Sequence, residues 1–198
     1  MKSLILTMSL AIATVLNSGS HFSNTAAPAA KVPVSKASVM LDGRIEQREW
    51  DKALKVKVSD SLSLYFQQDA SNLYLALANP HGQQTLMMVD FYVEPEDKVL
   101  VNLHASAKLG ERTLQGQDYG DWDWWNNRLW YANVVRSGNS ASQRFLLDEA
   151  KEFQIRKSRL KGKKLRLMFE ITYPESMTTT FPANTSPTST QNWLELAL

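Results

Sequence analysis

The chain has 198 residues and a formal net charge of +2, with 43% hydrophobic and 21% charged residues. This composition is typical of one globular domain. The net charge is too small to indicate a polyanionic partner such as nucleic acid. The absence of cysteine and the presence of only three histidines exclude disulfides, thiolate metal sites and a cysteine nucleophile, and leave little material for histidine-based catalysis.

The first twenty residues have the pattern of a secretory signal peptide. Lys2 precedes an apolar run from Leu4 to Leu16, and a polar stretch with small residues follows. The run is too short to span a bilayer. We expect cleavage between residues 20 and 30 and export to a bacterial periplasm or the outside of the cell, with no membrane span.

Residues 21–38 are rich in Ala, Pro and Ser without periodicity, which predicts a flexible leader. We expect the folded domain to comprise residues 39–198. Near its start, Asp42-Gly43 predicts a turn. The segment that follows is expected to form one short helical turn, because Trp50, Ala53 and Leu54 then share a face.

Several short segments further along alternate between apolar and polar residues. The clearest alternation is that of Leu165, Leu167, Phe169, Ile171 and Tyr173. Many such strands with little helical pattern between them predict an all-β fold, an antiparallel β-sandwich. Residues 178–192 are rich in Thr, Ser, Pro and Asn and are expected to form a long connection with little regular structure.

Residues 153–160 are expected to pair with the strand at 165–173 across a hairpin turn centred on Gly162. The basic residues of this region are Arg156, Lys157, Arg159, Lys161, Lys163, Lys164 and Arg166. They indicate either a cationic patch for an anionic polysaccharide or lipopolysaccharide, or a solvated hairpin whose charges discourage edge pairing. Acidic segments balance the total charge, which favours the solvated hairpin.

The order of these segments resembles a known family. The opening residues that carry the resemblance are Leu41-Asp42-Gly43, Glu46, Trp50 and Ala53, and residues 71–76, 90–95, 169–174 and 193–198 follow in the family's order. They are similar to family 9 carbohydrate-binding modules and the wider DOMON-like β-sandwich group. The resemblance covers about residues 39–198. It implies a β-sandwich in which Trp50 closes one end, and a protein that binds saccharides.

Residues 119–131 contain four of the six tryptophans, mixed with charged and amide side chains. Indoles beside polar groups suit a ligand with an apolar face and a polar rim, such as a sugar. The candidate stacking residues are Trp122, Trp124, Trp125, Trp130 and Tyr131, and the candidate hydrogen-bonding residues are Asp121, Asp123, Asn126, Asn127 and Arg128. In an extended segment Trp122, Trp124 and Trp130 share one face. We expect that face to contact the ligand, and the face with Trp125 and Tyr131 to be the core face.

Asp118, Asp121 and Asp123 could ligate calcium, which prefers carboxylate oxygens, although their spacing is not that of an EF-hand. No other cofactor is expected to be required. No nucleophile motif, phosphate loop or histidine metal motif occurs, and no carboxylate pair for glycoside hydrolysis is singled out. An enzyme is therefore not expected.

Two alternatives remain beside sugar binding. The first is a haem-binding electron carrier, as in related sandwiches, with axial ligands from among His81, His104, Met87, Met88 and Met168. The second is an adaptor or subunit that packs on a partner protein through the tryptophan-rich segment. The sequence favours an exported, non-catalytic carbohydrate-binding protein, which could act with a glycoside-degrading partner enzyme; the oligomeric state is left open.

Overall fold

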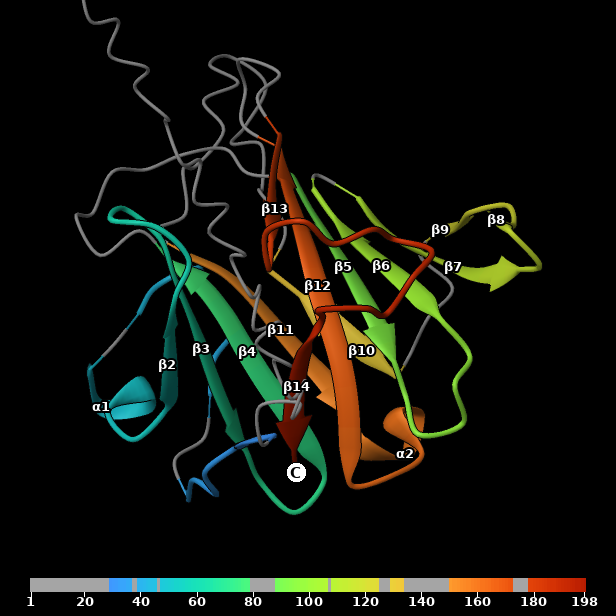
Figure 1. The fold of residues 1–198 in the computed structure, drawn as a ribbon. Coiled ribbons are helices and arrows are strands. Elements are labelled where there is room, and N and C mark those ends of the chain that lie inside the picture. The colour runs from blue at the N-terminus through green and yellow to red at the C-terminus, as the bar shows by residue number, and fades with distance from the viewer. Residues whose placement is uncertain are drawn as a thin grey trace, which may run out of the picture.

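The protein is an all-β sandwich, as the alternation predicts. The computed structural model describes residues 29–36, 39–45, 47–78, 88–106, 108–124, 129–133, 150–172 and 178–198. Within them the strands form two sheets (Figure 1), and the helices are two single turns, α1 (Gln47–Trp50) and α2 (Lys157–Leu160). In this described part of the chain, no helix has the length and apolar character needed to cross a membrane.

The larger sheet has the strand order β1-β14-β12-β5-β6-β7-β8, with β13 paired to β12 and β9 paired to β7. The bounds of its strands are β1 (Ala30–Lys31), β5 (Met88–Glu94), β6 (Val101–Ala105), β7 (Leu109–Gln115), β8 (Asp118–Tyr119), β9 (Asp123–Trp124), β12 (Lys164–Thr172), β13 (Thr178–Phe181) and β14 (Leu194–Ala197). All of these pairs are antiparallel except β1 with β14, which is parallel.

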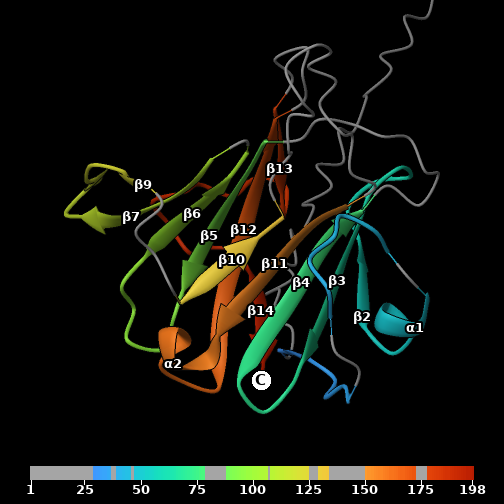
Figure 2. The same ribbon diagram turned by 180° about the vertical axis from the view of Figure 1, so that it is seen from behind.

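The smaller sheet has the order β10-β11-β4-β3-β2 and is antiparallel throughout. Its strands are β2 (Leu54–Lys57), β3 (Ser63–Gln68), β4 (Asn72–Ala78), β10 (Trp130–Ala132) and β11 (Ala150–Arg156). Seen from behind, this sheet faces the viewer, with α1 beside β2 and α2 at the end of β11 (Figure 2).

The core lies between the two sheets and consists of the apolar residues that alternate along each strand. The smaller sheet contributes Leu73, Leu75 and Leu77 from β4, all without exposed surface. At the centre, Phe91 of the larger sheet stacks on Phe169, with ring centroids 4.7 Å apart. Apolar burial on one face of each sheet is the dominant stabilising term in such a fold.

The predicted hairpin between residues 153–160 and 165–173 is wrong. β11 pairs with β4 and β10, whereas β12 pairs with β5, β13 and β14 in the other sheet. The chain crosses between the sheets through α2, whose Leu160 is buried, and through Lys161 in the left-handed conformation at φ 49°. A polar glycine-containing turn is compatible with either connection, and alternation does not say which sheet a strand joins.

Two segments are more ordered than the sequence predicts. Ala30–Lys31 forms β1, and the adjacent Val32 is fully buried. Part of the predicted flexible leader therefore belongs to the domain. Thr178–Phe181 forms β13, and the chain that follows crosses the outer face of the larger sheet before β14 (Figure 1). Backbone pairing of such short segments leaves no periodicity to detect.

Trp50 has a structural role, as the resemblance implies, but it covers a face of the smaller sheet rather than one end of the sandwich. It lies on the outer face of the smaller sheet, is 4% exposed, and meets Tyr65 edge to face. Its Nε1 donates to Oε1 of the buried Glu152 at 3.2 Å, and the backbone N–H of Gly43 donates to Oε2 at 2.8 Å. Burial raises the pKa of Glu152 to about 8, and the nearby carboxylates of Asp42 and Glu49 act in the same direction.

Candidate functional site

Trp122 and Trp124 stand side by side on the outer face of the larger sheet. Their rings are stacked, with centroids 5.1 Å apart and planes at 27°. Trp124 pairs with Gly110 of β7. A Cβ at Gly110 would lie 2.6 Å from Cε3 of Trp124 and 3.2 Å from Cε3 of Trp122. The missing side chain of Gly110 is what allows both rings to rest against the strand.

Two cations flank the tryptophan pair. The Arg112 guanidinium lies over the Trp122 ring at 4.3 Å and over Tyr119 at 4.9 Å. Lys108 Nζ lies 5.6 Å from the Trp124 centroid. At these distances one ring face cannot hold two groups, so the faces of Trp122 are covered by Arg112 and Trp124. Trp124 is 38% exposed, and its face away from Trp122 is shared with the exposed Lys108.

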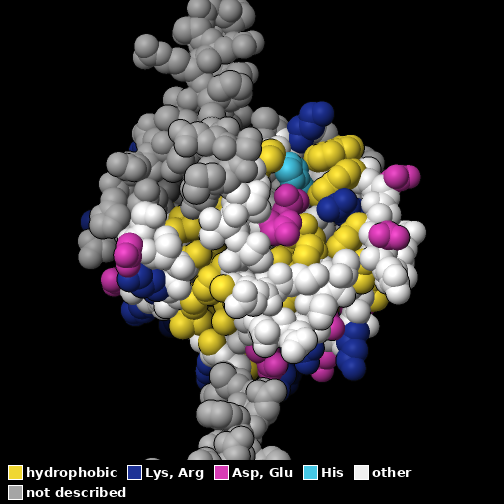
Figure 3. Space-filling view, turned by 45° about the horizontal axis from the view of Figure 1, so that its top comes forward, with side chains coloured by type: hydrophobic (Ala, Val, Ile, Leu, Met, Phe, Trp, Pro, Cys, Tyr) yellow, Lys and Arg dark blue, Asp and Glu magenta, His cyan; other side chains and the backbone are white. Residues whose placement is uncertain are grey.

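His104 packs edge to face against both tryptophan rings. It meets Trp122 at 67° and Trp124 at 87°, with centroids 5.4 and 5.7 Å away. Its Nδ1 bonds Asp90 Oδ1 and its Nε2 bonds Ser106 Oγ, each at 3.0 Å. Both ring nitrogens are therefore occupied, and the orientation of the imidazole is fixed. In Figure 3 hydrophobic side chains gather beside a histidine, with acidic and basic side chains at their border.

Asp90, His104 and Ser106 have the connectivity of a serine hydrolase triad. The alternation places His104 and Ser106 on one face, and Asp90 is the cross-strand partner of His104. Ser106 Oγ, however, accepts the N–H of Lys108 at 3.2 Å, and the N–H of Ser106 donates to the Lys108 carbonyl at 2.9 Å. The backbone amides of Ser106 and Lys108 are both engaged, so neither of these two is available to stabilise an oxyanion. We interpret the hydrogen-bonded row of Asp90, His104 and Ser106 as a structural support that fixes the imidazole against the tryptophan pair.

Next to this row is a patch of buried, unpaired polar atoms. Asn102 pairs with Tyr92 and Arg112 across the sheet and is fully buried. Among the residues that the structure describes, neither amide atom of Asn102 has a hydrogen-bond partner, and the buried Nε of Arg112 also lacks one. Such atoms are uncommon because each costs free energy in the folded state. They lie beside the guanidinium that stacks on Trp122.

A buried tyrosine, Tyr92, and a half-buried one, Tyr119, close this side of the site. The Tyr92 hydroxyl donates to Glu170 Oε2 at 2.8 Å, and burial raises the pKa of Tyr92. The Tyr119 hydroxyl donates to the Pro187 carbonyl at 2.7 Å, and burial raises the pKa of Tyr119 to about 12. The segment after β13 is thereby tied to the tryptophan-bearing end of the sheet.

The sequence misplaces the last aromatic residues of the 119–131 segment. Trp130 is 1% exposed, stacks on Phe153 and donates from Nε1 to Glu111 Oε2 at 3.0 Å, so it cannot be a stacking surface. Tyr131, predicted to face the core, is 45% exposed. β9 belongs to the larger sheet and β10 to the smaller one. The alternation therefore does not continue across the segment.

The remaining predicted residues divide into two groups. Asp121 and Asp123 are exposed next to the tryptophan pair. The others, Trp125, Asn126, Asn127 and Arg128, lie outside the described residues. The sequence did not single out as sugar contacts the side chains that surround the tryptophan pair. These are His104, Asp90, Ser106, Arg112 and Asn102. The alternation of polar residues along β5, β6 and β7 could have placed them on one face, but it does not encode the strand register that brings them beside the tryptophan pair.

The predicted metal and haem ligands do not form a site in the part of the chain that the structure describes. No three His, Asp or Glu side chains there come together, and this includes Asp118, Asp121 and Asp123. His81 and Met87 lie outside the described residues, Met88 is exposed, and Met168 is buried beside Tyr92. With both nitrogens of His104 hydrogen bonded, the geometry does not favour an axial histidine.

Most of the basic residues around α2 are paired. Arg159 bonds Glu111 at 3.1 Å and Lys161 bonds Asp97 at 2.8 Å. Arg166 bonds Glu94 at 3.0 Å, and Lys164 lies 3.8 Å from Glu195. These neighbours offset the local charge and favour the solvated surface over a cationic patch.

No family model matches the chain, and no curated protein matches its sequence. Among solved structures, the chain is similar to a crystal structure of a provisionally assigned carbohydrate-binding protein from Bacteroides uniformis, at 12% identity and a TM-score of 0.49. The match covers 85% of this chain and 96% of that one. A likeness at this level carries no inference about function, and the resemblance to family 9 modules stays a prediction.

Proposed function

We propose that the protein is an exported saccharide-binding protein that uses Trp124 as its stacking surface and does not turn its ligand over. The observation that carries the proposal is the exposed indole of Trp124, held in place by Trp122 and His104. A rigid aromatic ring with a polar border offers large contact area at low entropic cost.

In this proposal the C–H face of a pyranose lies on the face of Trp124 that points away from Trp122. The sugar displaces Lys108, whose cation–π contact at an exposed position is worth only about 0.5–1 kcal/mol. Trp122 acts as a support, because Arg112 and Trp124 cover its faces. Asp121 and Asp123 bond the sugar hydroxyls, and Asn126 and Arg128 remain candidates for the same role.

Binding without turnover fits the carboxylates of the described chain. Glycoside hydrolysis needs two carboxyl groups across one cleft, one with a raised pKa. Among the described residues, the carboxyl group of Glu152 has a raised pKa, and it lies under Trp50 on the other sheet, away from the tryptophan pair. Export by residues 1–20 and cooperation with a glycoside-degrading enzyme are part of the same proposal.

The test is a titration of intrinsic tryptophan fluorescence with neutral mono- and oligosaccharides, with and without calcium. We expect a saturable change that Trp124→Ala abolishes while circular dichroism shows an intact fold. Met40→Ala, which removes an exposed apolar side chain that is not part of the proposed site, should leave binding unchanged. No response from the folded wild-type protein to any saccharide would refute the proposal and favour a protein partner for Trp124.

A further inference from the structure

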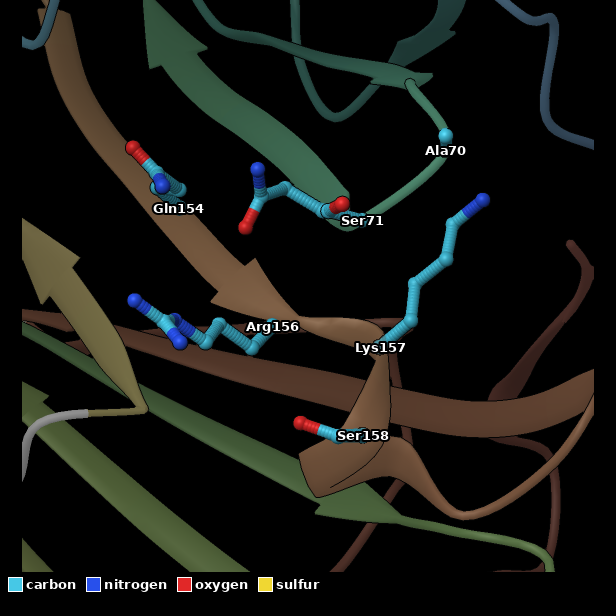
Figure 4. A pocket seen from close by; sticks show the side chains of 7 residues that line it. Ala70, Ser71, Gln154, Arg156, Lys157 and Ser158 are labelled. Carbon is cyan, nitrogen blue, oxygen red and sulfur yellow. The ribbon is translucent and has the colours of Figure 1, made fainter.

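A hollow lies on the outer face of the smaller sheet, which is the layer of the sandwich that does not carry Trp124. It encloses about 500 Å³ where β4 begins and β11 ends (Figure 4). Its lining residues are Ala70, Ser71, Asn72, Gln154, Arg156, Lys157 and Ser158. Hydroxyl, amide and cationic groups therefore surround a space large enough for one sugar ring.

The strand register places an exposed aromatic ring at the border of this hollow. Tyr131 of β10 pairs with Gln154 of β11, and Arg156 of β11 pairs with Asn72 of β4. Trp130 and Ile155, which alternate with these residues, are buried in the core. Tyr131, Gln154, Arg156 and Asn72 therefore share the outer face, with directly opposed side chains about 5 Å apart at Cβ.

Arg156 and Gln154 have unused hydrogen-bonding capacity. Among the residues that the structure describes, neither side chain has a hydrogen bond or an ion pair, in contrast to the nearby Arg159 and Lys161. In Figure 4 both lie on the same side of β11, whereas Lys157 extends toward the turn at Ala70. The Lys157 ammonium is engaged there with the Asp69 carbonyl.

Asp69, which precedes the lining residues Ala70 and Ser71, has a carboxylate that is already engaged. Asp69 accepts the backbone N–H groups of Ser71 and Asn72, each at 2.6 Å, and the Tyr74 hydroxyl at 2.8 Å. Burial alone would raise its pKa, but these bonds outweigh burial and lower it. The Asn72 amide in turn donates to the Tyr74 hydroxyl at 3.2 Å. These hydrogen bonds fix the position of Asn72 at the edge of the hollow. Because Asp69 is bonded to Ser71, Asn72 and Tyr74, its carboxylate does not pair with Arg156, whose positive charge stays available for a ligand.

We infer that this hollow is a second binding site, selective for a carboxylated sugar such as a hexuronic acid. The planar Arg156 guanidinium matches a carboxylate with two parallel hydrogen bonds. Gln154 and the free Asn72 Oδ1 bond the ring hydroxyls, and the exposed ring of Tyr131 takes the C–H face. The inference does not rest on the Trp124 surface, since its residues lie on the other sheet.

A neutral sugar lacks the group that Arg156 recognises. Since a hydrogen bond to a charged group contributes about 1.5–3 kcal/mol, glucuronate is expected to bind at least about tenfold more tightly here than glucose. Arg156→Lys keeps the charge and loses the planar fork, so it should retain only part of this preference.

The experiment is a protein-observed NMR titration of the full chain with methyl glucuronoside and with the matched methyl glucoside. We expect saturable shifts with the glucuronoside. The affinity that they report should fall at least about tenfold in Arg156→Gln and in Tyr131→Ala. Lys163→Gln removes an exposed charge that does not line the hollow, and Trp124→Ala removes the proposed neutral-sugar surface. Both should leave glucuronoside binding unchanged, with circular dichroism confirming the fold of every variant.

Four outcomes would overturn the inference. The first three are no binding of the glucuronoside, equal binding of the two glycosides, and glucuronoside binding that survives Arg156→Gln. Loss of glucuronoside binding in Trp124→Ala alone would assign the acidic sugar to the other sheet and also overturn it. Loss of neutral-sugar binding in Trp124→Ala, with glucuronoside binding intact, is the result expected if both sites exist.

Discussion

Glu152 should make the stability of the protein fall as the pH rises. Its pKa is 4.5 in an unfolded chain and about 8 in the folded protein, where burial disfavours the charged form. Between these values the folded state binds more protons than the unfolded state, so the free energy of unfolding decreases with pH. The contribution is fully present below pH 4.5. It is lost by about pH 8, up to roughly 5 kcal/mol in total.

The perturbation that tests this is Glu152→Gln, which cannot ionise. The amide accepts only one of the two bonds that Trp50 and Gly43 donate, so a loss of about 1–3 kcal/mol is expected near pH 5, where the wild-type carboxyl is neutral, and this difference should shrink or reverse toward pH 8. The pH slope between 5 and 8 should decrease relative to wild type. Urea unfolding at several pH values measures both quantities, and Asp118→Asn, which alters an exposed carboxylate, serves as the control. An unchanged slope in Glu152→Gln would refute the reasoning.

Three further substitutions separate structural from binding residues. Trp130→Ala should cost about 3–5 kcal/mol in urea unfolding, because the indole is fully packed in the core; a cost under about 1 kcal/mol would contradict its burial. Gly110→Ala places a Cβ 2.6 Å from the Trp124 ring. It should weaken neutral-saccharide binding about tenfold in the fluorescence titration, and unchanged affinity would show that the ring position is unimportant. Asn102→Leu removes two buried unpaired atoms and should leave stability equal or about 1 kcal/mol higher in thermal unfolding; a large loss would mean that the amide is bonded in solution.

The alternation of apolar residues was sufficient to predict the sheet layers. Leu165, Leu167 and Phe169 are buried as predicted, and Trp50 closes the outer face of the smaller sheet. The partner of each strand was harder to predict. β11 and β12 are adjacent in sequence but belong to different sheets, and the turn at Lys161 has the same composition in a hairpin as in a crossing connection.

The site could be predicted only in part for a related reason. The composition of residues 119–131 identifies an unusual concentration of indoles, and two of them lie together at the surface. Which rings face outward depends on where the chain changes sheet, and this change reverses the expected positions of Trp130 and Tyr131. His104 and Arg112 come to the tryptophan pair from β6 and β7 through register, which no local pattern encodes.

The most direct test of Trp124 as the sugar surface is an NMR titration that follows the indole N–H signals of the full chain with a neutral oligosaccharide. We predict that the Trp124 signal shifts most and saturates, that Trp122 follows with a smaller shift through the stacked pair, and that the buried Trp50, Trp130 and Trp193 stay unchanged. A saturable shift confined to the buried tryptophans, or no shift of Trp124 at any saccharide concentration, would contradict the proposed function.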